Sequence, residues 1–242
     1  MLTYGSLFSG IGGLDLGLDR AGMTCKWQVE IDDYATKVLE RHWPNVRRWR
    51  DVRTWPQSDT TPVDLICGGD PCQANSRANA PHGSKAESLG GEFIRIVDVL
   101  RPRIVLRETP PSRKDAPWTW QRFRTDLESL GYAVFPFRFR SCCVGAECRR
   151  ERVFLLAELG KSAGDRLEGG SENGADGRGN QDVGVPPPVH TPDRVQLPRP
   201  CGYGSSADVP GGMDRLRCLG NAVVPQVSQW LGERIIEYEA GE

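Results

Sequence analysis

One cysteine stands where its thiol could do chemistry, in the segment Gly68-Gly69-Asp70-Pro71-Cys72-Gln73. The apolar run at 63–67 predicts a strand, and two glycines and a proline then restrict the backbone just before Cys72. A thiol held rigidly at the C-terminal edge of a parallel sheet, where such sheets bind ligands, can act as a nucleophile. The Pro-Cys dipeptide alone does not distinguish this from a loop cysteine of no consequence.

A second candidate is the glycine-rich turn Phe8-Ser9-Gly10-Ile11-Gly12-Gly13, between a predicted strand and a predicted helix. Glycines there let the backbone approach a ligand closely, with the helix N-terminus pointing at it. Glu30 ends the next predicted strand, where a carboxylate can accept hydrogen bonds from a ribose, and Asp51 could bind an adenine amine. These features predict a site for an adenosine-containing cofactor, but their spacing does not separate a nicotinamide cofactor from S-adenosylmethionine.

The elements that must position these residues alternate between strands and helices. Strands are predicted at 3–8, 25–29, 63–67, 103–106, 132–138 and 153–157, and helices at 14–21, 34–42, 93–100 and 118–130, with a last helix after 223. This alternation predicts an α/β fold with a doubly wound, mostly parallel sheet and helices on both faces. The helical spacing of Trp118, Trp120 and Phe123 favours core packing over base stacking.

Composition divides the chain into three parts. Residues 1–160 have the pattern of one α/β domain, and from Lys161 to Gly212 the chain holds 11 glycines and 7 prolines in 52 positions. Such a segment has little to bury, so we expect 164–183 to be mobile and 185–200 to lie against the domain. Apolar residues return after Met213, so we expect 212–242 to pack back on residues 1–160.

Charge, cysteines and hydropathy narrow the function classes. The net charge is −1, and the one basic segment is 101–160, with 12 basic and 7 acidic residues. Contact with nucleic acid therefore needs a local patch. The start of the chain does not resemble a signal peptide and no apolar run is long enough to span a membrane, so we expect a cytoplasmic protein with reduced thiols. Eight cysteines without a CxxC pair and only three histidines predict no metal site.

Six segments, taken in order, resemble the motifs of the bacterial and phage DNA (cytosine-5)-methyltransferases. The resemblance covers 3–158 and 214–236, and it rests on Phe8–Gly13, Glu30 with Asp51, Pro71-Cys72-Gln73, Arg101–Glu108, Arg149–Phe154 and Leu219–Pro225. It implies a Rossmann-like methyltransferase fold that uses S-adenosylmethionine, releases S-adenosylhomocysteine, needs no metal and acts on double-stranded DNA. Residues 1–160 would then be the catalytic, cofactor-binding domain, and 161–211 a reduced target-recognition insert.

The resemblance also implies roles for individual residues. The catalytic residues that it implies are Cys72, Glu108, Arg150 and Arg152. The cofactor-binding residues that it implies are Phe8, Ser9, Gly10, Ile11, Gly12, Gly13, Glu30, Ile31, Asp51, Val52, Asp70, Asn221 and Ala222. The DNA-binding residues that it implies are Gln73, Ser76, Arg77, His82, Lys85 and Arg149.

The implied reaction agrees with the chemistry of these side chains. The Cys72 thiolate would add to C6 of a flipped-out cytosine while a protonated Glu108 supplies a proton at N3. Arg150 and Arg152, two residues apart on one strand, would project the same way, hold the base and the phosphate backbone, and favour the thiolate. A mobile loop at 73–91 would close over the base.

Several residues depart from the family pattern. Glu108-Thr109-Pro110 stands for the usual Glu-Asn-Val, Arg107 for an apolar residue, Cys148 for a glutamine, and Asp70 for phenylalanine or proline. A carboxylate at 70 would raise the pKa of the nearby thiol unless it is paired, for instance with an arginine.

These departures leave alternatives open. The chain could methylate RNA, or DNA with little sequence preference. It could also be a degenerate cofactor-binding protein that needs a partner for activity. We expect a monomer unless the recognition region requires that partner.

Overall fold

The computed structural model describes residues 1–56, 60–70, 89–110, 120–146, 150–160 and 212–241. Seven strands form one sheet in the order β3-β2-β1-β4-β5-β7-β6, and β7 is antiparallel to both of its neighbours. The strands are β1 Thr3–Leu7, β2 Thr24–Val29, β3 Arg47–Trp49, β4 Leu65–Gly68, β5 Ile104–Thr109, β6 Tyr132–Arg140 and β7 Glu151–Leu159. The prediction of a doubly wound, mostly parallel α/β sheet is confirmed.

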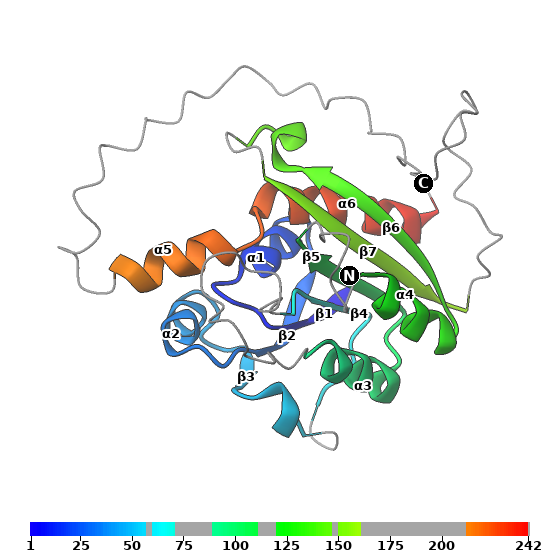
Figure 1. The fold of residues 1–242 in the computed structure, drawn as a ribbon, viewed down its shortest axis with the longest axis horizontal. Helices are drawn as coiled ribbons and strands as arrows, with labels where there is room; N and C mark the ends of the chain where they lie inside the picture. The colour runs from blue at the N-terminus through cyan, green and yellow to red at the C-terminus, as the bar shows by residue number, and fades with distance from the viewer. Residues whose placement is uncertain (57–59, 71–88, 111–119, 147–149, 161–211, 242) are drawn as a thin grey trace, which may run out of the picture.

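Helices cover both faces of this sheet (Figure 1). One face carries the first and last helices of the chain, and the other carries two helices from its middle. The helices are α1 Gly13–Arg20, α2 Asp33–His42, α3 Gly90–Leu100, α4 Trp120–Ser129, α5 Gly212–Asn221 and α6 Pro225–Ala240, with short 3-10 turns at Val52–Thr54 and Ser141–Val144. The helix α5 lies beside α2.

The two faces of the sheet bury two separate apolar clusters because successive strand residues point to opposite sides. On β4, Ile66 packs with α3 and α4, whereas Leu65 and Cys67 pack with α1 and α6. Phe123 of α4 is 4% exposed and makes an edge-on contact with Phe93 of α3. Its predicted place in the core is confirmed, while Trp118 lies outside the described residues.

Small residues let α6 approach α1 closely. A Cβ added at Gly17 would lie 2.0 Å from the Ser228 Oγ, and one at Gly232 would lie 2.7 Å from the Ala21 Cβ. The Ser228 hydroxyl also donates to the Gly13 carbonyl oxygen at 3.1 Å. The end of the chain is therefore fixed directly beside the first turn of its first helix.

The structure adds elements that the sequence did not predict. Strand β3 has three residues, and two of them are arginines. Because it lacks the apolar pattern of the other strands, it was not predicted. Helix α5 follows the glycine-rich segment, where we expected only a return of apolar residues. Strands β6 and β7 run two residues further than predicted at one or both ends.

Some predictions fall outside the described residues. The expectations for 164–183 and 185–200 lie there, so the three-part division of the chain stays a prediction. Among the described cysteines, Cys25 and Cys67 are buried free thiols, and none of that group forms a disulfide. In the part of the chain that the structure describes, no helix is both long and apolar enough to cross a membrane.

Candidate active site

The glycine-rich turn joins β1 to α1 through three residues with left-handed backbone. Phe8, Gly10 and Gly12 have φ of 54°, 56° and 81°. Positive φ is strained for phenylalanine, and such strain is concentrated at functional sites. The Ser9 amide donates to the Val29 carbonyl oxygen at 3.1 Å and fixes the turn on β2, while a Cβ at Gly10 would meet no atom within 4 Å. The turn is therefore held in place and open to a ligand at Gly10.

Glu30 lies against this turn from the end of β2. Its carboxylate accepts hydrogen bonds from the Gly10 amide at 2.7 Å and the Asp32 amide at 2.8 Å. Ile31, the next residue, is 60% exposed although it is apolar. The structure thus brings Glu30, Ile31 and the glycine turn to one edge of the sheet.

Asp51 follows β3, the strand next to β2. Its carboxylate accepts a hydrogen bond from the Arg53 amide at 2.9 Å and forms an ion pair with the Arg53 guanidinium at 2.7 Å. Val52 is buried in the apolar core. Asp51 and Glu30 therefore lie at the C-terminal ends of neighbouring strands, as predicted, but Arg53 already binds the Asp51 carboxylate.

The C-terminal segment completes this side of the site. The Val223 carbonyl oxygen lies 2.3 Å from the position of a Cβ at Gly13, so only glycine fits there. The Arg150 guanidinium donates to the Leu219 carbonyl oxygen at 3.4 Å, and Asn221 is exposed beside Ala222. Segment 219–225 thus contacts both Arg150, just before β7, and the glycine turn.

Glu108 is the penultimate residue of β5 and faces Arg152 of the neighbouring strand β7. Its carboxylate forms an ion pair with the Arg152 Nε at 2.5 Å. Burial raises the pKa of Glu108, and the nearby cations of Arg152, Arg150 and Arg107 oppose that shift. A Cβ at Gly69 would lie 2.8 Å from the Glu108 Oε2, so the carboxylate lies against the backbone three residues before Cys72.

Asp70 and Arg107, two of the residues that depart from the family pattern, are bound to each other. The Arg107 Nε donates to the Asp70 Oδ1 at 2.6 Å, and both side chains are 4% exposed. The pairing of Asp70 with an arginine is confirmed. The Asp70 carboxylate is therefore bound and buried. The prediction that Asp70 binds a cofactor then applies to its backbone atoms only.

A buried polar network beneath the glycine turn was missed in the sequence. The Asp15 carboxylate accepts hydrogen bonds from the Gln28 Nε2 at 2.8 Å and the Ser6 Oγ at 3.1 Å, and the Arg48 Nε donates to the Gln28 Oε1 at 2.8 Å. Burial raises the pKa of Asp15 to about 6, although the hydrogen bonds from Gln28 and Ser6 oppose the shift. An acidic residue on the apolar stripe of α1, between Leu14 and Leu18, was the available signal.

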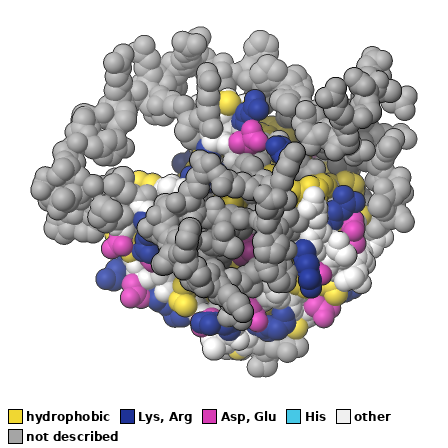
Figure 2. Space-filling view, viewed as in Figure 1, with side chains coloured by type: hydrophobic (Ala, Val, Ile, Leu, Met, Phe, Trp, Pro, Cys, Tyr) yellow, Lys and Arg dark blue, Asp and Glu magenta, His cyan; other side chains and the backbone are white. Residues whose placement is uncertain are grey.

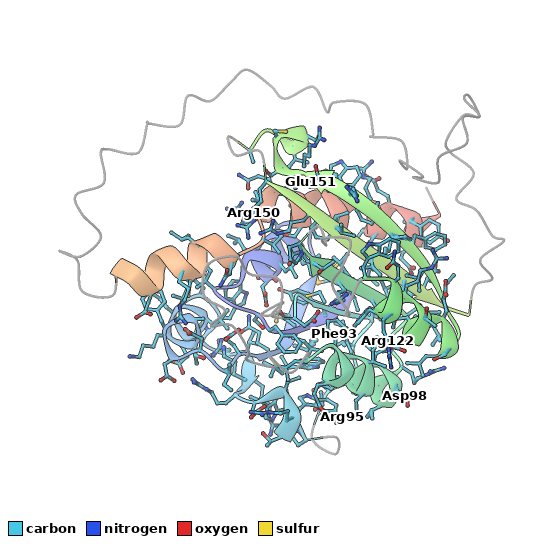
Figure 3. All side chains as sticks on the ribbon, viewed as in Figure 1. Phe93, Arg95, Asp98, Arg122, Arg150 and Glu151 are labelled. Atoms are coloured by element: carbon cyan, nitrogen blue, oxygen red, sulfur yellow. The ribbon has the colours of Figure 1, made fainter. Side chains whose placement is uncertain are left out.

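Several predicted site residues lie outside the described residues, namely Cys72, Gln73, Ser76, Arg77, His82, Lys85 and Arg149. Figure 3 shows Arg150 and Glu151 at the same end of β7, and Phe93 where α3 faces the sheet. On the face shown in Figure 2, basic and acidic side chains are interspersed over the described part of the surface.

The geometry joins a glycine turn, an acidic residue at the next strand end and a buried carboxylate–arginine pair at one sheet edge. Residues 2–172 match the model of the C-5 cytosine-specific DNA methylase family. The chain belongs to this family. Its fold and its motif order agree with that membership.

Relatives of this chain include type II methyltransferases of bacteria. The type II methyltransferase M.Eco47II of Escherichia coli is 33% identical over 64% of this chain and 39% of its own length. The type II methyltransferase M2.BsuMI of Bacillus subtilis is 28% identical over 95% of this chain and 74% of its own length. This chain thus spans about two fifths of the first relative and three quarters of the second.

Solved structures agree with the fold. A protein of E. coli described as a DNA modification methyltransferase encoded within a prophage has a TM-score of 0.55 and 26% identity, covering 66% of this chain and 47% of its own. The DNMT2 of Spodoptera frugiperda has a TM-score of 0.56 at 20% identity, covering 66% and 50%. The second likeness shows the fold alone.

Proposed function

We propose that this methylase transfers a methyl group from S-adenosylmethionine to C5 of a flipped cytosine in DNA. One observation carries the proposal. The Glu108–Arg152 pair lies against Gly69, three residues before Cys72, at the same sheet edge as the glycine turn. A nucleophile, a proton donor and a cofactor turn are the groups that this chemistry needs close together.

The residues of the glycine turn fit the cofactor. Gly10 leaves space that a side chain would fill, and Glu30 offers carboxylate oxygens beside it for ribose hydroxyls. The exposed side chain of Ile31 suits an adenine ring. We assign Phe8–Gly13, Asn221 and Ala222 to the same cofactor site, because Val223, the residue after Ala222, lies against Gly13. Once bound, S-adenosylmethionine supplies an electrophilic methyl group on its sulfonium.

The chain's own residues would act on the cytosine. The Cys72 thiolate forms a bond to C6, which pushes electrons toward C5 and N3. Glu108 donates a proton at N3, and its raised pKa favours the protonated acid that this step requires. Arg152 orients the Glu108 carboxyl group, while Arg150, just before β7, adds a second positive charge near it. C5 takes the methyl group, which leaves S-adenosylhomocysteine. A water molecule then accepts the C5 proton, the electron pair of that C–H bond expels the Cys72 thiolate from C6, and the N3 proton returns to the Glu108 carboxylate.

A second candidate function is favoured by the composition of residues 161–212. This stretch holds 11 glycines and 7 prolines in 52 positions, so few side chains in it are suited to read base edges. We infer either low sequence preference or a partner protein that supplies recognition. The residues proposed to contact DNA are Gln73, Ser76, Arg77, His82, Lys85 and Arg149.

Transfer of a radiolabelled methyl group to duplex DNA, with RNA in parallel, tests this function. The Cys72→Ser variant should lose transfer because a serine hydroxyl without a strong base is a far poorer nucleophile than a thiolate. The matched Cys142→Ser variant, at an exposed thiol, should keep it. A duplex with 5-fluorocytosine should become covalently attached to Cys72, since fluorine blocks the final elimination. Full activity of Cys72→Ser would refute the assignment, and transfer to RNA alone would favour the RNA alternative.

A further inference from the structure

Burial of the ion pair Asp70–Arg107 carries a desolvation cost in free energy. Both side chains are 4% exposed, and the Arg107 Nη1 has no hydrogen-bond partner among the described residues. A buried ion pair usually stabilises a fold no better than apolar side chains of similar size, and a missing hydrogen bond makes it worse. Stability alone therefore gives no reason for the two charges.

The position of the pair suggests its use. Strands β4 and β5 are in register, with Gly68 opposite Arg107. Just beyond this point, Gly69 lies against Glu108 and Asp70 binds Arg107. Two consecutive residues after β4 are thus fixed to two consecutive residues of β5.

Arg107 also connects this point to the cofactor turn. Its guanidinium lies over the Phe123 ring, 4.1 Å from the centroid. Phe123 contacts Phe93 edge-on at 5.2 Å, and Phe93 stacks on Phe8 of the glycine turn at 6.5 Å. A continuous row of packed rings therefore runs from the Asp70 anchor to the strained residue at the start of the turn.

Covalent geometry sets how far the Cys72 backbone can be from the pair. Consecutive Cα atoms are about 3.8 Å apart, so the Cα atoms of Asp70 and Cys72 are separated by at most about 7.6 Å. At that range an uncompensated charge in a poorly solvated site changes the ionisation of a thiol. Arg107 provides that compensation for Asp70.

We propose that Asp70 and Arg107 are a positioning pair, which anchors the chain just before Cys72 to the strand that carries Glu108 and cancels the Asp70 charge at the nucleophile. The proposal rests on the function proposed for Cys72. Neither residue touches the reacting atoms, so both act through the nucleophile's position and its electrostatic surroundings. The two departures from the family pattern, Asp70 and Arg107, are then explained together, because each charge compensates the other.

Alkylation of Cys72 tests the electrostatic half without requiring methyl transfer. The rate of iodoacetamide labelling of the Cys72 peptide, followed by mass spectrometry over a range of pH, gives the midpoint of thiol ionisation. In Asp70→Asn the unbalanced Arg107 cation should lower the midpoint, and in Arg107→Gln the unbalanced carboxylate should raise it, each by about one pH unit. The double variant Asp70→Asn/Arg107→Gln should return it toward wild type, and Arg107→Lys should hold it there. Glu108 and Arg152 are unchanged in all four.

The matched control is the exposed pair Arg124–Glu128 on α4, where Arg124→Gln should leave the midpoint unchanged. Shifts of Asp70→Asn and Arg107→Gln in the same direction, or no shift in either, would overturn the electrostatic half. So would a midpoint that moves as far in Arg107→Lys as in Arg107→Gln. If one single variant fails to fold, the shift of the other single variant and its reversal in the double variant still decide.

Kinetics test the positioning half. Each charge-breaking single variant should lower kcat at least about tenfold with little change in S-adenosylhomocysteine affinity, and the double variant should recover part of that loss. Losses that multiply in the double variant would refute the pairing. If wild type transfers no methyl group to any nucleic acid, the proposed function fails, while the alkylation profiles still decide whether the pair controls the thiol.

Discussion

The Val223 carbonyl oxygen fills the space that a side chain on Gly13 would need, since a Cβ there would lie 2.3 Å from it. These residues are 210 positions apart in the chain, and they join the start of the first helix to the entry of the last. A side chain at residue 13 would therefore displace the C-terminal segment around Val223.

Gly13→Ala should separate the start of α1 from the segment around Val223, or strain both. The clash is with backbone, which cannot rotate away, so we expect a loss of about 1–3 kcal/mol in the free energy of unfolding and a weaker affinity for S-adenosylhomocysteine. Urea denaturation and calorimetry measure the two effects. Gly91→Ala is the matched control, because a Cβ there meets nothing within 4 Å. Equal stability of the two variants would contradict this contact.

Glu30→Ala should weaken cofactor binding. The Glu30 carboxylate lies on the Gly10 amide, and its loss removes charge-assisted hydrogen bonds to the ribose, worth about 1.5–3 kcal/mol. Isothermal titration with S-adenosylhomocysteine gives the change directly. Asp33→Ala, an exposed carboxylate three residues away that pairs with Arg50, should bind as wild type does. Unchanged affinity in Glu30→Ala would remove Glu30 from the cofactor site.

Glu108→Gln should slow methyl transfer by about 10²–10⁴-fold, the usual contribution of a positioned general acid. The amide keeps the size of the side chain but has no acidic proton to give to N3. Single-turnover rates on duplex DNA measure the loss. The control is Glu151→Gln. Glu151 lies on β7, as Arg152 does, but it pairs with Arg140 of β6, so this variant should keep nearly full activity. Wild-type rates in Glu108→Gln would exclude Glu108 as the proton donor.

Asp15 should make the fold less stable as the pH rises. Its pKa is raised from 3.8 to about 6 in the folded state, so between these values the folded chain binds more protons than the unfolded one. The contribution of Asp15 to stability is highest below about pH 4, falls as pH rises to about 6, and is then lower by about 3 kcal/mol.

The variant Asp15→Asn imitates the protonated acid and should remove most of this slope. Unfolding by urea at pH 4.5, 5.5 and 7.5 compares the two proteins. We expect the stability of the variant relative to wild type to increase across this range. A difference that is constant with pH would show that Asp15 does not titrate in the folded chain.

The sequence predicted those parts of the site that obey local rules. Glycines with positive φ at 10 and 12, and a carboxylate at the end of the second strand, follow from short-range geometry. The resemblance of six motifs to those of a known family implied the roles of Glu108, Arg150 and Arg152. The two arginines were predicted to project from one strand, but β7 begins at Glu151, so only Arg152 belongs to it.

Other parts depend on contacts between distant residues and could not be predicted. The burial of Asp15 is one such part, since Gln28 and Ser6 satisfy its carboxylate inside the protein. The pairing of Asp70 with an arginine was predicted as a condition, and only the fold identified Arg107 as that arginine. Strand β3 forms at the edge of the sheet because β2 offers it hydrogen bonds, despite its polar sequence.

The close contact between α1 and α6 joins the two ends of the described body to each other. Gly17, Ser228 and Gly232 let the helices meet, so the last helix is held by the first rather than by its neighbour in the sequence. We therefore expect the number of residues between Gly160 and Gly212 to be changeable without loss of this contact.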